Sequence, residues 1–251
     1  MTDRSTLETF SSVILDFHDS NNEGYCTVAR HLTALKIALD TLSARYSSVN
    51  PAPGRLLSQC TSRIFPYPAT FTPFGANEPS SFTYEGELEK RTFLFKGRTN
   101  LGQSICIKFV HRYGEDVHKW CAEHGFAPKL IGSEVLPGGW IMVIMELLDE
   151  SWILLADTPD RGKLKPAIHE AIVRLHQKDM VHGDIRSTNI MVNVEKDMFM
   201  LVDYDWAGVM DKVKYPEFIN TDPALRRPLD VRYDAFILPQ HDIDMLENIF
   251  S

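Results

Sequence analysis

The chain has 251 residues, of which 44% are hydrophobic and 10% aromatic, which is enough apolar material for a substantial buried core. Its net charge of −8, without any run of basic residues, argues against nucleic acid or an anionic membrane as the main partner. No apolar run reaches the length of a membrane span, the first residues do not resemble a signal peptide, and four scattered cysteines suit a reducing compartment. We therefore expect an intracellular, cytoplasmic protein.

Two amphipathic helices are expected before the main domain. The stronger one carries apolar residues at alternating steps of four and three, namely Val28, Leu32, Leu35, Leu39, Leu42 and Tyr46. The weaker one carries Leu7, Phe10, Ile14 and Phe17. The stronger stripe covers too few heptads for a stable coiled coil, which favours packing on the parent domain over dimerisation. Prolines between Pro51 and Pro79 then indicate an extended connector, so residues 1–79 form an N-terminal extension.

Residues 92–97 and 104–110 are expected to form two strands joined by a turn. Lys108 lies inside the second, otherwise apolar strand, where burial of a lysine is unfavourable without a partner. Taken alone, Lys108 is more simply interpreted as an edge-strand lysine that faces water. A short helix up to Glu123 follows, and its first acids, Glu115 and Asp116, are candidate partners, with Asp116 slightly preferred. Both acids equally suit the first turn of a helix, where negative charge is favourable.

Two more strands, at residues 128–131 and 140–147, are predicted on either side of a turn that contains a proline and two glycines. The segment 165–178 then carries apolar residues at helical spacing, namely Ile168, Ala171, Ile172 and Leu175. This predicted helix leads directly into a polar loop that begins at His182.

The loop and the hairpin that follows it hold the most informative pattern in the chain. Apolar runs at residues 190–194 and 198–202 are separated by a polar three-residue turn, which predicts a β-hairpin. If the residues on either side of the turn pair directly, Asn189 faces Asp203 at the open end of the hairpin. Opposed residues lie about 4.5–5.5 Å apart and point to the same face.

These spacings point to phosphoryl transfer. Asn189 and Asp203 offer oxygen ligands of the kind that Mg²⁺ prefers, with water and substrate phosphate completing its shell. Asp184 lies just upstream in the loop, near enough to accept a proton from an attacking hydroxyl. A solvated acidic hairpin is the alternative for any one of these residues, but it explains the three together poorly.

The loop resembles the catalytic loop of the protein-kinase-like superfamily, and within it the fungal-type (basidiomycete) protein kinase-like proteins. Protein kinases read His-Arg-Asp-Leu-Lys-x-x-Asn at this loop. Asp184 matches the catalytic base and Asn189 the metal-binding asparagine, while Arg186 stands where a lysine meets the γ-phosphate. Gly183 replaces the usual arginine, as in aminoglycoside and other small kinases.

The resemblance extends over roughly residues 80–251 and assigns further roles. Asp203 matches the metal-binding aspartate of Asp-Phe-Gly, in which Tyr204 and Asp205 replace the other two residues. Asp242 resembles the acid that braces the catalytic-loop backbone; a helix N-cap is the alternative.

Upstream of the catalytic loop, the resemblance implies a nucleotide site. Lys108 would hold the α- and β-phosphates, with Asp116 as its partner. Glu146 to Leu148 would offer backbone groups to the edge of the adenine, and Met145 would lie behind it. The Gly-x-Gly-x-x-Gly phosphate loop is absent, because Gly86 is the only glycine between Phe82 and Phe95.

The fold implied is α+β: a bilobal protein-kinase-like fold with a small antiparallel-sheet N-lobe at 80–147 and a reduced helical C-lobe at 148–251. The C-lobe is expected to be truncated after the helix that contains Asp242. Residues 1–79 are the N-terminal helical extension.

The function implied is an ATP- and Mg²⁺-dependent phosphotransferase. A protein serine or threonine is the first choice of acceptor, since Arg186 stands at the lysine position. A small molecule is the second choice, favoured by Gly183 and by the absence of docking helices. A catalytically silent pseudokinase that binds partners is the third, favoured by the missing glycine loop.

Overall fold

The computed structural model describes residues 23–47, 68–89, 93–158, 161–217, 219–220 and 222–251. The chain divides into two units, residues 1–68 and 69–251. In the first unit, helix α1 spans Glu23–Ser47, so the stronger predicted helix is present and begins earlier than expected. The weaker one, at residues 7–17, lies outside the described residues. Within the described ranges, no helix combines the length and the apolar character that a bilayer crossing needs.

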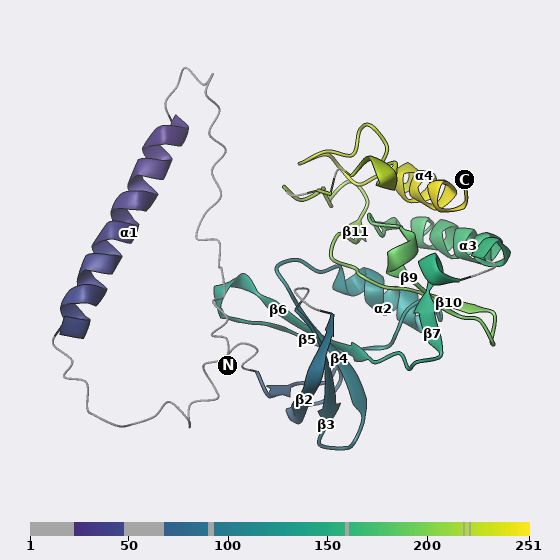
Figure 1. Cartoon of the computed structure of the whole chain (residues 1–251), viewed down its shortest axis with the longest axis horizontal. Helices are drawn as coiled ribbons and strands as arrows, with labels where there is room; N and C mark the ends of the chain where they lie inside the picture. Colours follow the sequence, from purple (N-terminus) through teal and green to yellow (C-terminus); the bar gives the residue numbers. More distant parts are fainter. Residues whose placement is uncertain (1–22, 48–67, 90–92, 159–160, 218, 221) are drawn as a thin grey trace. The chain divides into compact units, whose positions relative to one another are not determined.

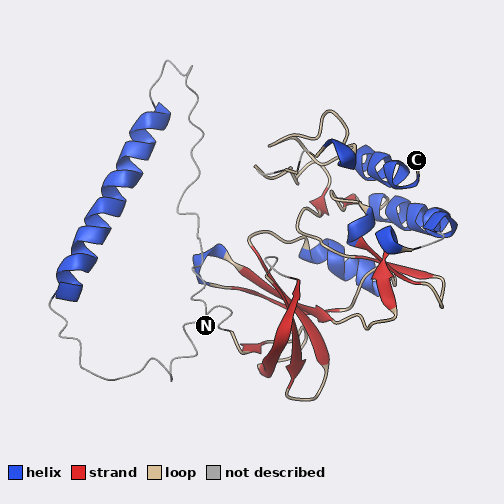
Figure 2. Ribbon diagram, in the orientation of Figure 1, coloured by secondary structure: helices blue, strands red, loops and turns tan. Residues whose placement is uncertain are grey.

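The second unit begins with a six-stranded antiparallel sheet in the order β1-β2-β3-β4-β6-β5 (Figures 1 and 2). Its strands are β1 (Thr70–Phe71), β2 (Ser80–Glu89), β3 (Leu94–Thr99), β4 (Ser104–Val110), β5 (Leu130–Val135) and β6 (Ile141–Glu146). The strands predicted around Lys108 and on both sides of the proline–glycine turn are all present. The short edge strand β1 belongs to this unit and lies upstream of the expected boundary at residues 79 and 80.

The sheet forms because its central strands are apolar on both faces. Ile105 and Ile107 are fully buried on one face, and Cys106 and Val143 are buried on the other face, which Lys108 shares. The rings of Phe95 and Phe109 lie 5.9 Å apart at a steep angle, the edge-to-face arrangement that aromatic pairs favour. Because both faces are buried, little water reaches the side chain of Lys108 on β4.

Helices and short strands make up the rest of the unit. The helices are α2 (Glu115–Glu123), α3 (Lys165–His176) and α4 (Pro239–Phe250). The short strands are β7 (Trp152–Leu154), β8 (Met180–Val181), β9 (Ile190–Asn193), β10 (Met198–Leu201) and β11 (Gly208–Val209). The 3-10 turns among the described residues are η2 (Pro137–Gly139), η3 (Leu155–Asp157), η4 (Arg161–Leu164), η5 (Ser187–Asn189) and η6 (Pro223–Leu225).

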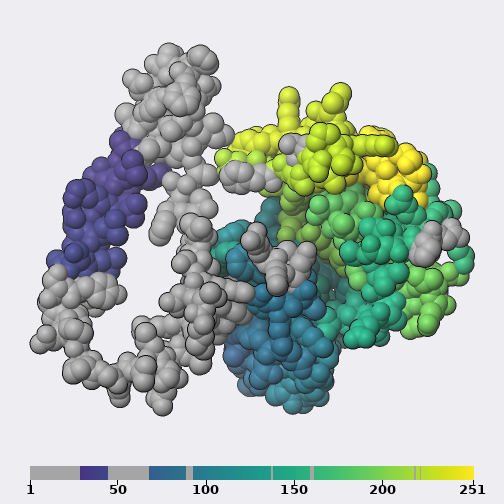
Figure 3. All heavy atoms as spheres, in the orientation of Figure 1, coloured from purple at the N-terminus to yellow at the C-terminus, as the bar shows by residue number. Residues whose placement is uncertain are grey.

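A shared hydrophobic core joins α2, α3, α4 and the β9–β10 hairpin. Ile168, Ile172 and Leu175 of α3 are fully buried and share a cluster with Leu246 of α4, which confirms the predicted helix leading into the loop. Val117 of α2 belongs to the same cluster, so α2 packs on the helical lobe. In Figure 3 the sheet lobe, in blue, and the helical lobe, in green and yellow, lie against each other within the second unit.

The β9–β10 hairpin differs from the predicted register by one residue. Asn193 pairs with Met198, so the turn has four residues, and Ile190 pairs with Leu201. The extra turn residue is stabilised by the Asn193 side chain, whose Oδ1 accepts from the backbone N–H of Lys196 at 3.1 Å. A single-residue shift exchanges the faces of a strand, so loop geometry decides the outcome.

As a consequence, Asn189 lies opposite Val202 rather than Asp203: the Val202 N–H donates to the Asn189 carbonyl at 2.9 Å. Asp203 follows immediately in a left-handed conformation, with φ of 69°. This conformation turns the chain directly after the strand, so both Asn189 and Asp203 remain at the open end of the hairpin.

Helix α2 carries a buried histidine in a single tautomer. His118 is fully buried, and its Nε2 lies 2.7 Å from the Pro128 carbonyl, which only accepts, so Nε2 carries the proton. Its Nδ1 therefore accepts from the Tyr113 hydroxyl, and its ring stacks on Tyr204 with centroids 4.5 Å apart. Burial lowers the pKa of His118 to about 4.

We expect acid to destabilise the second unit through His118. The unfolded chain binds a proton near the ordinary histidine pKa of about 6.5, whereas the folded state does so only near pH 4, so stability is lost as the pH falls between these values. Between pH 7 and 5 the wild type should lose about 2 kcal/mol more unfolding free energy than His118→Gln. Urea unfolding at both pH values measures this difference, and equal losses in the two proteins would contradict it.

Candidate active site

Lys108 is held between two carboxylates that come from the helical lobe. Its Nζ lies 2.6 Å from Oδ1 of Asp203 and 2.6 Å from Oδ1 of Asp205, and its side chain is 12% exposed. Burial pushes the pKa of Lys108 down, but the two carboxylates outweigh it, so the pKa lies above its ordinary value. For Asp203, burial is likewise outweighed by Lys108, so its pKa is lowered. Burial keeps the pKa of Asp205 above its ordinary value.

The loop that carries these carboxylates is fixed by the start of α2 (Figure 1). The Gly114 N–H donates to the Tyr204 carbonyl at 2.8 Å, and Tyr204 is buried. A Cβ at Gly114 would lie 2.5 Å from the Ala207 carbonyl oxygen, so only glycine allows this close approach. Helix α2 and the loop therefore form one packed unit beside Lys108.

The expected pairing of Lys108 with Asp116 is not what the structure shows. Asp116 is exposed, and Glu115 forms an ion pair with Lys119 one helical turn later. The reason is that α2 docks through Gly114, ahead of its first turn, so both acids lie on its surface. Lys108 is paired with Asp203 and Asp205 instead of with Glu115 or Asp116.

Asp184 lies in a second cluster, at the predicted catalytic loop. It is 5% exposed, and both of its oxygens have partners. Asn189 donates from Nδ2 to Oδ2 at 2.9 Å, and Arg227 donates from Nη2 to Oδ1 at 2.7 Å. Arg186 adds a further positive charge, with its Nε 3.2 Å from Oδ2. The sequence brings together Asp184, Arg186 and Asn189 as predicted, and the fold adds Arg227.

The backbone of this loop is held by Asp242, as predicted. The Asp242 carboxylate accepts from the N–H groups of His182 and Gly183 at 2.9 and 2.8 Å and is almost fully buried. Gly183 has φ of +83°, and a Cβ there would come within 2.9 Å of Ile237. Glycine therefore suits this position for steric reasons, and Asp242 is not the helix N-cap, which is Leu238.

The donor set fits a magnesium ion with a small number of protein ligands. Asn189 engages Asp184 through Nδ2 alone, and no described residue donates to its amide oxygen. Asp203 engages Lys108 through Oδ1 and has a second carboxylate oxygen. Mg²⁺ typically takes one or two such oxygens and retains water and phosphate. In the described ranges, no cluster of three or more His, Cys, Asp or Glu side chains is arranged to hold a metal ion.

The predicted adenine-binding segment follows β6. Met145 pairs with Cys106, two residues from Lys108 on β4, so its side chain shares a sheet face with Lys108. The Glu146 N–H is already used, because it donates to the Lys129 carbonyl at 2.9 Å. Leu148 lies in the connection to the helical lobe, and its backbone groups stay the stronger candidates for contact with a nucleotide.

Two solved structures share this architecture. The Cydia pomonella granulovirus kinase PK-1 is 17% identical, with a TM-score of 0.54 over 68% of this chain and 68% of that chain. Vaccinia related kinase 3 is 15% identical, with a TM-score of 0.50 over 81% of this chain and 68% of that chain. The second unit has the bilobal protein-kinase fold. No family model and no curated protein matches the sequence.

Two residues of this kinase-like unit lie in the site without having been predicted there. Asp205 binds Lys108, and its position two residues after Asp203 was the available signal. Arg227 binds Asp184 from 43 residues downstream, and nothing in the surrounding sequence marks it. Its guanidinium lies 4.9 Å from the Trp206 ring, and the side chain is 8% exposed.

Proposed function

We propose that the kinase-like unit is a phosphotransferase that moves the γ-phosphoryl group of ATP to an acceptor hydroxyl, with Mg²⁺ as the cofactor. The observation that carries this proposal is the pair of polar clusters at one hairpin end. One cluster is the ion pair of Lys108 with Asp203, and the other is the hydrogen bond of Asn189 to Asp184. Asp203 follows β10 and Asn189 precedes β9, so both clusters lie at the open end of the hairpin. Both solved neighbours are kinases, which supports the proposal.

Each residue has a distinct role in the proposed mechanism. Magnesium, held by Asn189 and Asp203, would neutralise charge on the phosphates. Lys108 binds phosphate oxygens, and Arg186 places a second positive charge beside Asp184. Asp184 orients the acceptor hydroxyl and receives its proton, and Asn189 keeps that carboxylate in place.

Two alternatives follow from particular observations. We propose a protein serine or threonine as the acceptor, because Arg186 stands where protein kinases carry the lysine that meets the γ-phosphate. A small molecule is the alternative, because glycine at position 183 resembles the catalytic loops of aminoglycoside and other small kinases. A silent pseudokinase is favoured by the missing glycine loop. The residues of the catalytic loop also lead us to propose that the chain is related to the fungal-type kinase-like proteins.

Thermal unfolding with ATP, in the presence and absence of Mg²⁺, tests nucleotide binding. A proposal of phosphotransfer requires a stabilisation that depends on the metal, because a ligand of the folded state raises its stability. Absence of any shift at millimolar nucleotide would favour the pseudokinase. Radiolabelled transfer to a protein panel and to a metabolite panel then identifies the acceptor class.

A further inference from the structure

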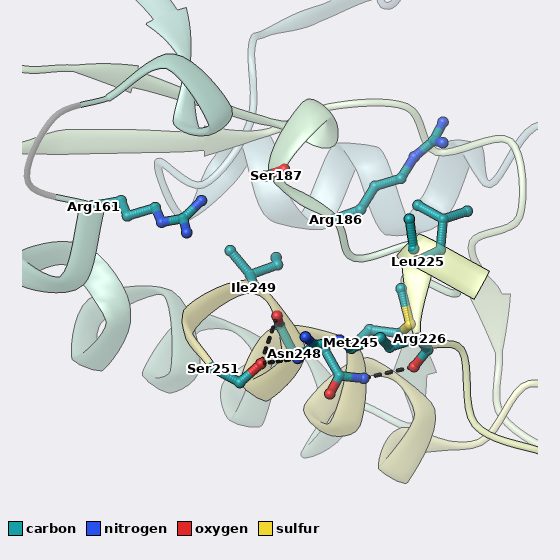
Figure 4. A pocket seen from close by; sticks show the side chains of 10 residues that line it. Arg161, Arg186, Ser187, Leu225, Arg226, Met245, Asn248, Ile249 and Ser251 are labelled. Atoms are coloured by element: carbon teal, nitrogen blue, oxygen red, sulfur yellow. Dashed lines mark hydrogen bonds between the residues drawn. The ribbon is translucent and has the colours of Figure 1, made fainter. Parts of the chain in front are cut away.

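A basic pocket opens beside the catalytic loop. It has a volume of about 250 Å³ and lies between the η5 turn, η6 and the end of α4 (Figure 4). Of the ten residues that line it, three are arginines, Arg161, Arg186 and Arg226, and none is acidic. Figure 4 shows Arg161 and Arg226 on opposite sides of the pocket, with Ser187 at its edge. The lining therefore concentrates positive charge around a cavity large enough for a small anionic group.

The pocket adjoins the Asp184 cluster through Arg186. Arg186 lines the pocket and also places its Nε 3.2 Å from Oδ2 of Asp184. Arg227 follows directly after Arg226 and donates to the other oxygen of Asp184. A group bound in the pocket would therefore lie next to the residue that we propose receives the acceptor's proton.

Two buried guanidinium nitrogens beside Asp184 make no hydrogen bond. Among the side chains of the described residues, the buried nitrogen and oxygen atoms without a hydrogen bond are Nε of Arg186 and Nη1 of Arg227. Nε of Arg186 still lies 3.2 Å from Oδ2 of Asp184, as an ion pair without hydrogen-bond geometry, so Nη1 of Arg227 is the donor left for a further acceptor. Burying a charged donor without an acceptor is unfavourable, so this atom marks a place where a ligand, an ion or water supplies one. One carboxylate faces two guanidinium groups here, which favours a further oxyanion nearby.

Two of the three lining arginines keep their charge free of an acidic partner among the described residues. Arg186 is paired with Asp184, whereas no described acidic side chain pairs with Arg161 or Arg226. Glu247 of α4 pairs with Lys165, so this acid is engaged outside the pocket lining. Arg226 donates to the Ser251 hydroxyl at 2.7 Å. The charges of Arg161 and Arg226 are therefore available to a ligand, and arginine binds phosphate and carboxylate groups in a bidentate manner.

We propose that this pocket is the acceptor site and that the acceptor carries an oxyanion, a phosphate or carboxylate group, close to the hydroxyl that receives the phosphoryl group. This inference rests on the proposed phosphotransfer, since it names the class of acceptor. Arg161 and Arg226 bind the oxyanion, and Arg186 and Arg227 lie between it and Asp184. A neutral acceptor of the same size would leave this charge unbalanced.

Binding of inorganic phosphate to the full chain tests the pocket without requiring turnover. Thermal unfolding is followed across a phosphate titration at constant ionic strength, because screening by salt alone weakens such contacts. The wild type should show a saturable stabilisation, and the double variant Arg161→Gln/Arg226→Gln should bind about tenfold more weakly or worse. Arg98→Gln, which removes one arginine from the sheet lobe and matches each single variant in charge, should behave as wild type.

The response to ATP and Mg²⁺, measured on the same proteins, separates the two proposals. A phosphate response that is equal in the wild type, the double variant and Arg98→Gln, or that is absent from the wild type, would overturn the proposed acceptor site. If ATP still stabilises the protein in a metal-dependent manner, phosphotransfer is supported independently of that result. A phosphate response confined to proteins with both arginines, without an ATP shift, would overturn phosphotransfer and leave an anion-binding pocket without an acceptor role. The single variants Arg161→Gln and Arg226→Gln, each expected to bind more weakly, give the same comparison if the double variant does not fold.

Two further probes identify the source of the oxyanion. Free O-phosphoserine and a short peptide that contains phosphoserine are compared in the same titration, with the unphosphorylated peptide as the blank. Tighter binding of the phosphopeptide would assign the anion to a protein acceptor, and equal binding would assign it to a small molecule. A response to the unphosphorylated peptide equal to that of the phosphopeptide would contradict recognition of an oxyanion.

Discussion

Replacement of Asp203 by alanine is expected to abolish the magnesium-dependent part of ATP binding. The variant removes a carboxylate that we propose as a metal ligand and one of the two partners of Lys108, which Asp205 still neutralises. At a nucleotide concentration a hundred times its dissociation constant, the wild type should gain about 2.7 kcal/mol of unfolding free energy. Thermal unfolding with ATP should show this gain only when Mg²⁺ is present.

Asp157→Ala is the matched control for this variant, because Asp157 is exposed on η3 and lies outside the site. It should retain the full metal-dependent gain. If Asp203→Ala kept the same gain as wild type, Asp203 would not be a metal ligand, and the proposed mechanism would lose its metal site.

Replacement of Asp184 by asparagine is expected to slow phosphoryl transfer by about 10²- to 10⁴-fold, the range typical of a lost general base. Asparagine keeps an oxygen that can accept from Arg227 but cannot take the proton of the acceptor hydroxyl. The stabilisation by ATP and Mg²⁺ should be unchanged, because Asp184 does not bind the nucleotide in the proposed mechanism. The rate of radiolabelled transfer measures the effect once an acceptor is known.

The loss of a buried ionic partner also lowers stability, so rates should be compared at a temperature at which both proteins are folded. Asp157→Asn provides a control with the same chemical change at an exposed position. Transfer at the wild-type rate by Asp184→Asn would show that Asp184 is not the base.

Phosphoryl transfer and oxyanion binding place different demands on the same few residues. Arg227 covers Asp184 in the structure, and its contact must persist or reorganise when an acceptor hydroxyl approaches. Nη1 of Arg227, which makes no hydrogen bond, and the charge of Arg186 beside it offer a place for the acceptor's own anion, so that binding would satisfy a donor that folding leaves without an acceptor. Recognition of the acceptor and alignment of the base would then share one set of contacts.

The sequence by itself determined the elements and the local motifs. Apolar runs joined by a turn indicated the strands around Lys108, helical spacing indicated α3, and the run from His182 to Asn189 predicted a polar loop that contains Asp184. Each of these patterns spans only a short stretch of sequence. The side-chain period and the motif spacing can therefore be recognised without knowledge of the fold.

Tertiary structure alone decided which distant residues meet. Lys108 pairs with carboxylates 95 and 97 residues away instead of with the nearby Asp116, because α2 docks through Gly114 and leaves its acids on the surface. Arg227 reaches Asp184 across 43 residues, and a four-residue turn moved the hairpin register by one position. Such contacts depend on how whole elements pack, and side-chain periodicity carries no information about which elements become neighbours.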